Sequence, residues 1–180
     1  MKKRFLALLL ALSLLSTPVL AAENSTDNFT RSKTYTGQFS DLPENHTFYE
    51  NVAALYEYGL SVGQADGTYG LSSPMTVGQA VIFAGRIRSL YRTGDPEAGP
   101  AAFTAAAVSL KDAQRVYAPY LWYLQAEGVL DKALDDHLAQ TATRAQMAHV
   151  LAGLLPETAL PLINDSLVTQ AYASRRRITD

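Results

Sequence analysis

One predicted helix start in this chain carries side chains suited to holding an anion. The run Thr143-Arg144-Ala145-Gln146 has the spacing of a capping box, in which a Thr hydroxyl and a Gln side chain each satisfy a free backbone N–H of the other residue. The first turn of a helix favours negative charge. Arg144 adds a planar guanidinium that can hold a carboxylate with two hydrogen bonds. Thr143, Arg144 and Gln146 are therefore candidate binding residues; the alternative is a surface arginine paired with a nearby acid.

A second capping box lies earlier in the chain, at Thr76 and Gln79. Val77 stands there where the other box has Arg144. This helix start offers the same backbone N–H groups but no guanidinium. Thr76 and Gln79 are therefore candidate binding residues that lack a neighbouring positive charge. We expect binding to depend mainly on Arg144, and a Val77→Arg substitution to add a site if the surrounding groove is intact.

Trp122 is the only tryptophan and a further candidate binding residue. Its apolar face can stack on the C–H surface of a sugar ring, although core packing fits the sequence equally well. The same two interpretations apply to Tyr49, Tyr117 and Tyr123, for which packing is favoured.

The sequence contains no set of residues that predicts catalysis. His46, His137 and His149 do not share a metal-ligand spacing, and cysteine is absent. Asp135-Asp136 is a pair of carboxylates in a polar stretch, where solvation is the favoured interpretation. Asp66-Gly67 lacks the further acidic ligands of a calcium loop and is typical of a turn. We therefore predict that this segment is not an enzyme and has no metal and no cofactor.

Composition narrows the classes of partner. The 180 residues are 48% hydrophobic and 18% charged, which is enough to bury the core of one or two small domains. Three of the 15 basic residues lie in the first four positions, and without them 12 basic residues face 17 acidic ones, a net charge of −5. Nucleic-acid binding needs a basic face, so the charge argues against it.

Four helices are expected to position the candidate residues, over Phe48–Tyr58, Val77–Tyr91, Pro119–Glu127 and Arg144–Leu155. Each shows apolar residues at helical spacing. Thr47 and Glu50 have the spacing of a third capping box before the first helix. Gly59 suits the left-handed position after its end, and Pro119 suits the first turn of the third helix.

The pattern of the first two helices recurs in the second pair. Gly59-Leu60 corresponds to Gly128-Val129-Leu130, 69 residues later, and Thr76 corresponds to Thr143, 67 residues later. We therefore expect two repeats, over 39–95 and 109–156, joined by a linker at 96–108. The second repeat lacks a counterpart to the turn that begins at Asp66.

The first repeat resembles the S-layer homology (SLH) domain of bacterial surface proteins. The resemblance is carried by Phe39-Ser40-Asp41, Phe48-Tyr49, Gly59-Leu60, Gly63, Asp66-Gly67-Thr68-Tyr69, Pro74 and Thr76. The sequence departs from the family at Val77-Gly78-Gln79, where Arg-Ala-Glu is usual. The resemblance implies an all-α fold of tandem SLH repeats, each a pair of short helices with long loops, in a pseudo-threefold arrangement. Residues 157–180 would then be a connection and the start of a truncated third repeat, at Ile178-Thr179-Asp180.

The N-terminus predicts export. A basic start, an apolar run from Phe5 to Leu15 and the sequence Val19-Leu20-Ala21 are typical of a signal peptide at 1–21. Residues 22–38 are polar and lack periodicity, which indicates a flexible linker. We expect a secreted protein with no membrane segment after cleavage, located at the cell wall.

By resemblance, the function is non-covalent binding to an anionic, pyruvylated polysaccharide linked to peptidoglycan, with Arg144 contacting the anion. One alternative is an envelope scaffold or protein-interaction module with degenerate repeats. Another is the anchoring part of a larger exported enzyme. The sequence leaves the oligomeric state open.

Overall fold

The computed structural model describes residues 24–160, apart from the side chains of residues 112 and 113. This part of the chain holds five α-helices, three 3-10 turns and no β-strand, which confirms the all-α prediction for it. The α-helices are α2 (Tyr49–Glu57), α3 (Val77–Thr93), α4 (Ala98–Ala107), α5 (Asp112–Ala126) and α6 (Arg144–Leu151), and the 3-10 turns are η1 (Thr26–Asn28), η2 (Asp135–His137) and η3 (Glu157–Ala159). The tandem repetition and the pseudo-threefold arrangement remain predictions. The predicted signal peptide and third repeat start lie outside the described residues.

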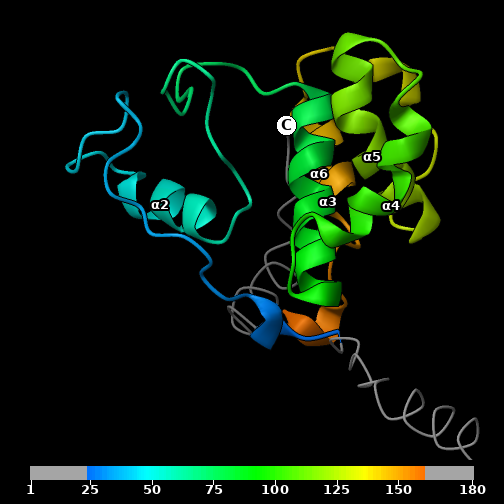
Figure 1. Cartoon of the computed structure of the whole chain (residues 1–180), viewed down its shortest axis with the longest axis horizontal. Coiled ribbons are helices and arrows are strands. Elements are labelled where there is room, and N and C mark those ends of the chain that lie inside the picture. Colours follow the sequence, from blue (N-terminus) through cyan, green and yellow to red (C-terminus); the bar gives the residue numbers. More distant parts are fainter. Residues whose placement is uncertain (1–23, 161–180) are drawn as a thin grey trace, which may run out of the picture.

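Helix α3 is the centre of a bundle with α4, α5 and α6, while α2 lies to one side (Figure 1). The buried cluster of this bundle draws on α3, α5, α6 and the loops around η2, and its members are Val77, Ala80, Val81, Ala84, Leu121, Leu124, Leu130, Leu134, Leu138, Val150 and Leu154. Full burial of a Val or Leu side chain is worth about 1.5–3 kcal/mol, so this cluster is the main stabilising element of the bundle.

Glycines let α5 approach its neighbours closely. A Cβ added at Gly85 of α3 would lie 3.0 Å from the Tyr120 Cβ, and one added at Gly99 of α4 would lie 2.5 Å from the Tyr123 Cζ. Tyrosine rings therefore occupy the space that side chains would take at these positions. Tyr120 and Tyr123 are one helical turn apart, so a single face of α5 contacts both α3 and α4.

The segment around α2 has its own aromatic core. Tyr35, Phe39, Leu42, Val52 and Ala53 are buried together, separately from the bundle cluster. The rings of Tyr35 and Phe39 lie 5.5 Å apart.

Asp41 fixes the loop that follows α2. Its carboxylate accepts hydrogen bonds from the backbone N–H groups of Tyr69 (2.6 Å), Gly70 (2.8 Å) and Leu71 (3.1 Å). These bonds, the one from Tyr69 first, hold the pKa of Asp41 below its usual value. The adjoining Asp66-Gly67 is a turn, as predicted, because Thr68 donates to the Asp66 carboxylate from both its N–H (3.0 Å) and its hydroxyl (2.7 Å).

Residues 24–38 are not the flexible linker that the sequence indicated. The backbone N–H of Ser25 donates to the Tyr91 carbonyl at the end of α3 (3.2 Å), and that of Ser32 donates to the Glu57 carbonyl at the end of α2 (2.9 Å). Tyr35 is only 9% exposed. The polar composition hid one buried aromatic side chain and several backbone hydrogen bonds, which together attach this segment to both helices.

The predicted linker at 96–108 contains a helix instead. Helix α4 has six alanines among its ten residues, and alanine has the highest intrinsic helix propensity. Pro100 lies in its first turn, where no N–H is needed. The N–H of Gly99 donates to the Ser89 hydroxyl (2.9 Å), so α3 also helps to start α4. The density of Gly and Pro around residue 96 marked the start of this helix and not a loop.

Two further predictions of helix limits were wrong. Helix α5 begins at Asp112, so Pro119 lies inside the helix and not in its first turn. Phe48 is the N-cap of α2 and makes no side-chain capping bond, so the capping box predicted at Thr47 and Glu50 does not form. The neighbouring His46 takes part instead, because its Nδ1 accepts from the Phe48 N–H (3.2 Å).

Helices α2 and α5 end in the same way. Gly59 and Gly128 both have φ of +70°, a left-handed conformation in which a side chain would be strained. The Leu60 N–H donates to the Leu55 carbonyl, and the Val129 N–H donates to the Leu124 carbonyl, each at 2.9 Å. Gly59 therefore ends α2, as predicted.

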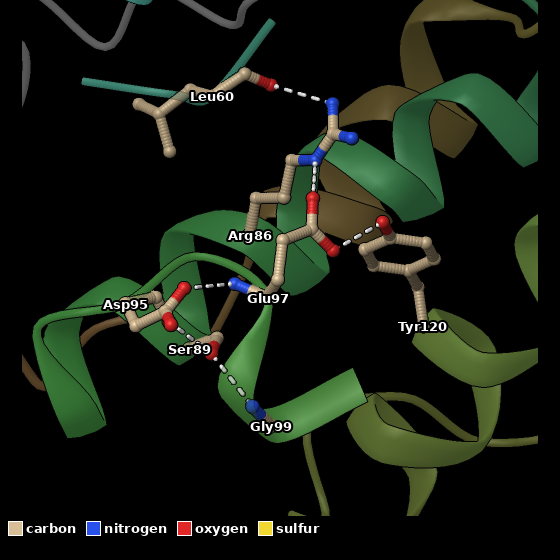
Figure 2. A network of polar contacts seen from close by, with 7 residues as sticks. All are labelled: Leu60, Arg86, Ser89, Asp95, Glu97, Gly99 and Tyr120. Carbon is tan, nitrogen blue, oxygen red and sulfur yellow. Dashed lines mark hydrogen bonds and ion pairs between the residues drawn. The ribbon is translucent and has the colours of Figure 1, made fainter. Parts of the chain in front are cut away.

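A polar network attaches the loop after α2 to the bundle (Figure 2). Arg86 of α3 donates from Nε to the Glu97 carboxylate (2.8 Å) and from Nη1 to the Leu60 carbonyl (3.3 Å). The Tyr120 hydroxyl donates to the other oxygen of Glu97 (2.6 Å). Burial, followed by this hydrogen bond to Glu97, raises the pKa of Tyr120 to about 12. Arg86 and Tyr120 thus meet at the Glu97 carboxylate, and Arg86 also links this cluster to Leu60 in the loop after α2.

Candidate functional site

The start of α6 has the predicted capping box. The Gln146 N–H donates to the Thr143 hydroxyl (3.2 Å), and the Thr143 N–H donates to the Gln146 side-chain oxygen (2.9 Å). Arg144 is exposed and forms no ion pair with any described residue. Within the described part of the chain, the backbone N–H groups of Arg144 and Ala145 also have no acceptor. The site therefore offers one free guanidinium beside two free backbone donors.

The start of α3 has the same capping box, but it is closed, meaning that its first backbone N–H groups already have acceptors within the protein. The Gln79 N–H donates to the Thr76 hydroxyl (3.2 Å), and the Thr76 N–H donates to the Gln79 side chain (2.8 Å). The two donors that are free in α6 are used here, because the N–H groups of Val77 and Gly78 donate to the carbonyls of Gln140 (2.9 Å) and Leu138 (2.8 Å).

Val77 itself is 0% exposed and belongs to the bundle core. A Cβ on Gly78 would lie 2.7 Å from the Tyr117 ring, so this turn also packs against α5. This geometry argues against the expectation that Val77→Arg would add a binding site, because the Val77 side chain lies in the core and the N–H groups of Val77 and Gly78 already have acceptors.

The segment that closes the start of α3 also leads into α6. The Ala142 N–H donates to the Met75 carbonyl (2.8 Å), and Thr76 and Thr141 form an isolated antiparallel bridge. Thr143 follows directly. The backbone around Thr76 and Gln79 therefore supports the loop that delivers Arg144, while their side chains cap α3.

Trp122 lies on α5 and is half-buried. It belongs to neither buried cluster within residues 24–160. Within residues 24–160 it shares no hydrogen bond, ion pair or ring contact with Arg144, so the structure does not join these two candidates. The tyrosines behave as packing residues: Tyr123 is 6% exposed, Tyr117 packs against Gly78, and the Tyr49 ring lies 5.6 Å from that of Tyr35.

The polar residues around η2 form local contacts. Gln125 donates to the Asp135 carboxylate (2.8 Å), and both Asp135 and Asp136 are exposed, in agreement with a solvated pair. His149 Nε2 lies 3.6 Å from the Asp131 carboxylate. Among the described residues no group of three or more His, Asp or Glu side chains could hold a metal ion. No helix within residues 24–160 is long and apolar enough to cross a membrane.

One ion-pair cluster beside the C-terminal end of α6 was not predicted. The Glu127 carboxylate at the end of α5 lies 3.1 Å from the Arg88 guanidinium and 3.0 Å from that of Arg92. Arg88 also donates to the Leu154 carbonyl after α6 (2.9 Å). The spacing of Arg88 and Arg92 places them on one face of α3, but their partners come from other elements and are not visible in the sequence. This cluster holds the far end of α6 against the bundle.

Comparison with known families gives one match. Residues 38–80 match the S-layer homology domain, which confirms the resemblance for that part of the first repeat. Domains of this family generally mediate anchoring to the bacterial cell wall, and they bind but do not catalyse. A search of curated proteins found no match, and neither did a search of solved structures.

Proposed function

From the premise that residues 38–80 match an S-layer homology domain, we propose that this chain attaches a secreted protein to the bacterial cell wall. The attachment is non-covalent. The partner is an anionic, pyruvylated polysaccharide linked to peptidoglycan, and the binding site is the start of α6, with Arg144 as its central residue and Thr143 and Gln146 as its frame.

One observation carries the choice of site. Arg144 is exposed and free of ion pairs within the described chain, beside two backbone N–H groups that have no acceptor there. A carboxylate placed at this point would gain charge-assisted hydrogen bonds from the guanidinium and favourable interaction with the helix start. Each such bond to a charged group contributes about 1.5–3 kcal/mol. The equivalent turn of α3 has neither the charge nor the free donors.

The internal repetition supports the same interpretation. Both proposed repeats place a left-handed glycine after their first helix and a Thr–Gln capping box before their second. We infer that they are two SLH repeats, of which only the second keeps an open anion site. Trp122 of the second repeat is the proposed stacking partner for a sugar ring.

Binding to purified cell-wall sacculi tests the proposal. Arg144→Ala should weaken binding about ten-fold or more with unchanged helix content, because it removes the charged donors. Arg144→Lys should restore part of the affinity, since lysine keeps the charge without the bidentate fork. Lys111→Ala is the matched control, because it removes one exposed positive charge elsewhere.

Mild acid removal of the pyruvate ketal from the sacculi completes the test. Wild-type binding should fall to the level of Arg144→Ala. Unchanged binding after pyruvate removal, or equal binding by wild type and Arg144→Ala, would instead favour a scaffold or protein-interaction module. The closed start of α3 is the observation that favours this second candidate.

A further inference from the structure

A histidine in the loop before α6 has a buried ring nitrogen. His137 lies in η2 and is half-buried as a residue, but its Nδ1 is fully buried and forms no hydrogen bond within residues 24–160. Buried polar side-chain atoms in folded proteins nearly always have a partner. An exception on a histidine marks a place where the protonation state of a side chain can affect the fold.

The backbone of His137 belongs to the segment that closes the start of α3. Its carbonyl accepts from the Gln140 N–H (2.9 Å). The carbonyls of Leu138 and Gln140 in turn accept from the first N–H groups of α3, at 2.8 and 2.9 Å. A displacement of this ring therefore alters the hydrogen bonds that close the start of α3 and the segment that leads to Arg144.

The number of protons on the ring decides how well the buried nitrogen is accommodated. A neutral imidazole can carry its one proton on Nε2 and leave Nδ1 as a lone pair. The protonated ring carries a second N–H at Nδ1, and a buried N–H without an acceptor is unfavourable. Acidification therefore favours a conformation of the loop in which Nδ1 reaches water.

The acidic side chains near this loop do not compensate the charge of a protonated ring. Within the described chain, no carboxylate oxygen lies within 4.0 Å of a ring nitrogen of His137. Asp135 and Asp136 of the same turn are exposed, and Asp135 accepts from a side-chain amide of α5 (2.8 Å). Asp131, at the beginning of the loop, lies 3.6 Å from His149 instead.

The other elements around the loop bring neutral or basic groups. The start of α3 has no charged side chain over Thr76–Gln79, and Tyr117 of α5, which packs against this turn, has an uncharged hydroxyl. Lys132 of the loop is basic, and the ionisable residues of α6 are Arg144 and His149. Positive charges of this kind oppose the addition of another cation at His137.

We propose that His137 is a pH-sensitive switch of the segment that orders the start of α6. At neutral pH the uncharged ring stays in place and the segment remains bonded to α3. At about pH 5 the protonated ring moves to solvent, the hydrogen bonds from Val77 and Gly78 open, and Arg144 loses its fixed position. The consequence for wall binding rests on the proposed function of Arg144, whereas the opening of the start of α3 does not.

Hydrogen exchange of the backbone amides of the full chain, followed by NMR at pH 7.5 and 5.0, tests this opening. With exchange rates corrected for the intrinsic effect of pH, protection of the Val77 and Gly78 amides should fall about ten-fold or more at the lower pH. The Ala84 amide in the middle of α3 should change less.

Variants assign the effect to one ring. His137→Phe removes both the titration and the buried nitrogen, so its protection should be the same at both pH values. The double variant His46→Gln and His149→Gln leaves His137 as the only histidine and should behave like wild type, without any change in the loop. Equal protection of the wild-type amides at both pH values, or the same loss in wild type and His137→Phe, would overturn the switch.

Binding to sacculi at the same two pH values separates this inference from the proposed function. Wild type should bind about ten-fold more weakly at pH 5.0, and His137→Phe should bind equally at both. A pH-dependent opening with no binding to sacculi at either pH would support the switch and overturn the proposed function. A pH-dependent opening with pH-independent binding would overturn the link between His137 and Arg144.

Discussion

The two capping boxes allow a test by exchanging Val77 and Arg144. Each residue is the first of a helix capped by Thr and Gln, yet Val77 is 0% exposed and Arg144 is exposed. We predict that Val77→Arg destabilises the protein and creates no binding site. We predict that Arg144→Val leaves stability nearly unchanged and weakens binding to sacculi about ten-fold or more, as Arg144→Ala does.

The expected loss of stability in Val77→Arg follows from the complete burial of Val77. Replacement of Val77 forfeits about 1.5–3 kcal/mol of apolar burial. A guanidinium held at that position without a partner would cost several kcal/mol more. If the long side chain turns outward instead, it must displace residues 138–140 and break the hydrogen bonds from Val77 and Gly78 to their carbonyls. By either route we expect a loss of at least about 3 kcal/mol out of a typical total of 5–15 kcal/mol.

Thermal unfolding followed by circular dichroism measures this loss. For a chain of this size the expected decrease in Tm is about 6–12 °C for Val77→Arg. Arg144→Val, a surface change away from packed contacts, should stay within about 0.5 kcal/mol of wild type. A Val77→Arg protein that is as stable as wild type and binds sacculi more tightly would refute the argument, since it would show that the start of α3 is open.

Two other predictions concern polar groups of the bundle. A spectrophotometric titration should show one tyrosine ionising near pH 12, and the Tyr120→Phe substitution should remove this step. Because folding raises the pKa of Tyr120, the protonated hydroxyl contributes fully to stability below pH 10, and this contribution is lost as the pH rises to about 12. Glu127→Gln should lower the free energy of unfolding in urea by about 1–2 kcal/mol through loss of its ion pairs with Arg88 and Arg92, both at about 3 Å, whereas Glu44→Gln at an exposed position should have no effect.

The sequence predicted local features well where the physical cause is local. The boxes at Thr76 and Thr143 form because the reciprocal bonds involve residues only three positions apart. The end of α2 at Gly59 depends on the freedom of glycine at positive φ. The box at Thr47 failed although its spacing is the same, because His46 caps the start of α2 in its place.

The errors arise where distant residues decide the structure. Helix α4 was missed because its start depends on Ser89 of α3, and the extent of α5 was underestimated because packing against α3 and α4 outweighs the cost of Pro119 inside a helix. The sequence also did not predict that Val77 is buried while Arg144, at the same position of its helix, is exposed. Nothing near Val77 in the sequence indicates that carbonyls more than 60 residues later occupy its helix start.

The closed start of α3 is linked to the open start of α6 through the backbone of residues 138–142. The carbonyls of residues 138 and 140 accept hydrogen bonds from the start of α3, and the Ala142 N–H donates to the Met75 carbonyl. These bonds fix the position of Thr143, which follows directly in the chain. Arg144 then faces solvent at the first turn of a helix that is held at its other end by Arg88. Pre-organisation of this kind lowers the entropic cost of binding. The presence of Val77 and not an arginine at the start of α3 is therefore consistent with a division of roles, in which one capped helix start supports the loop that holds the other.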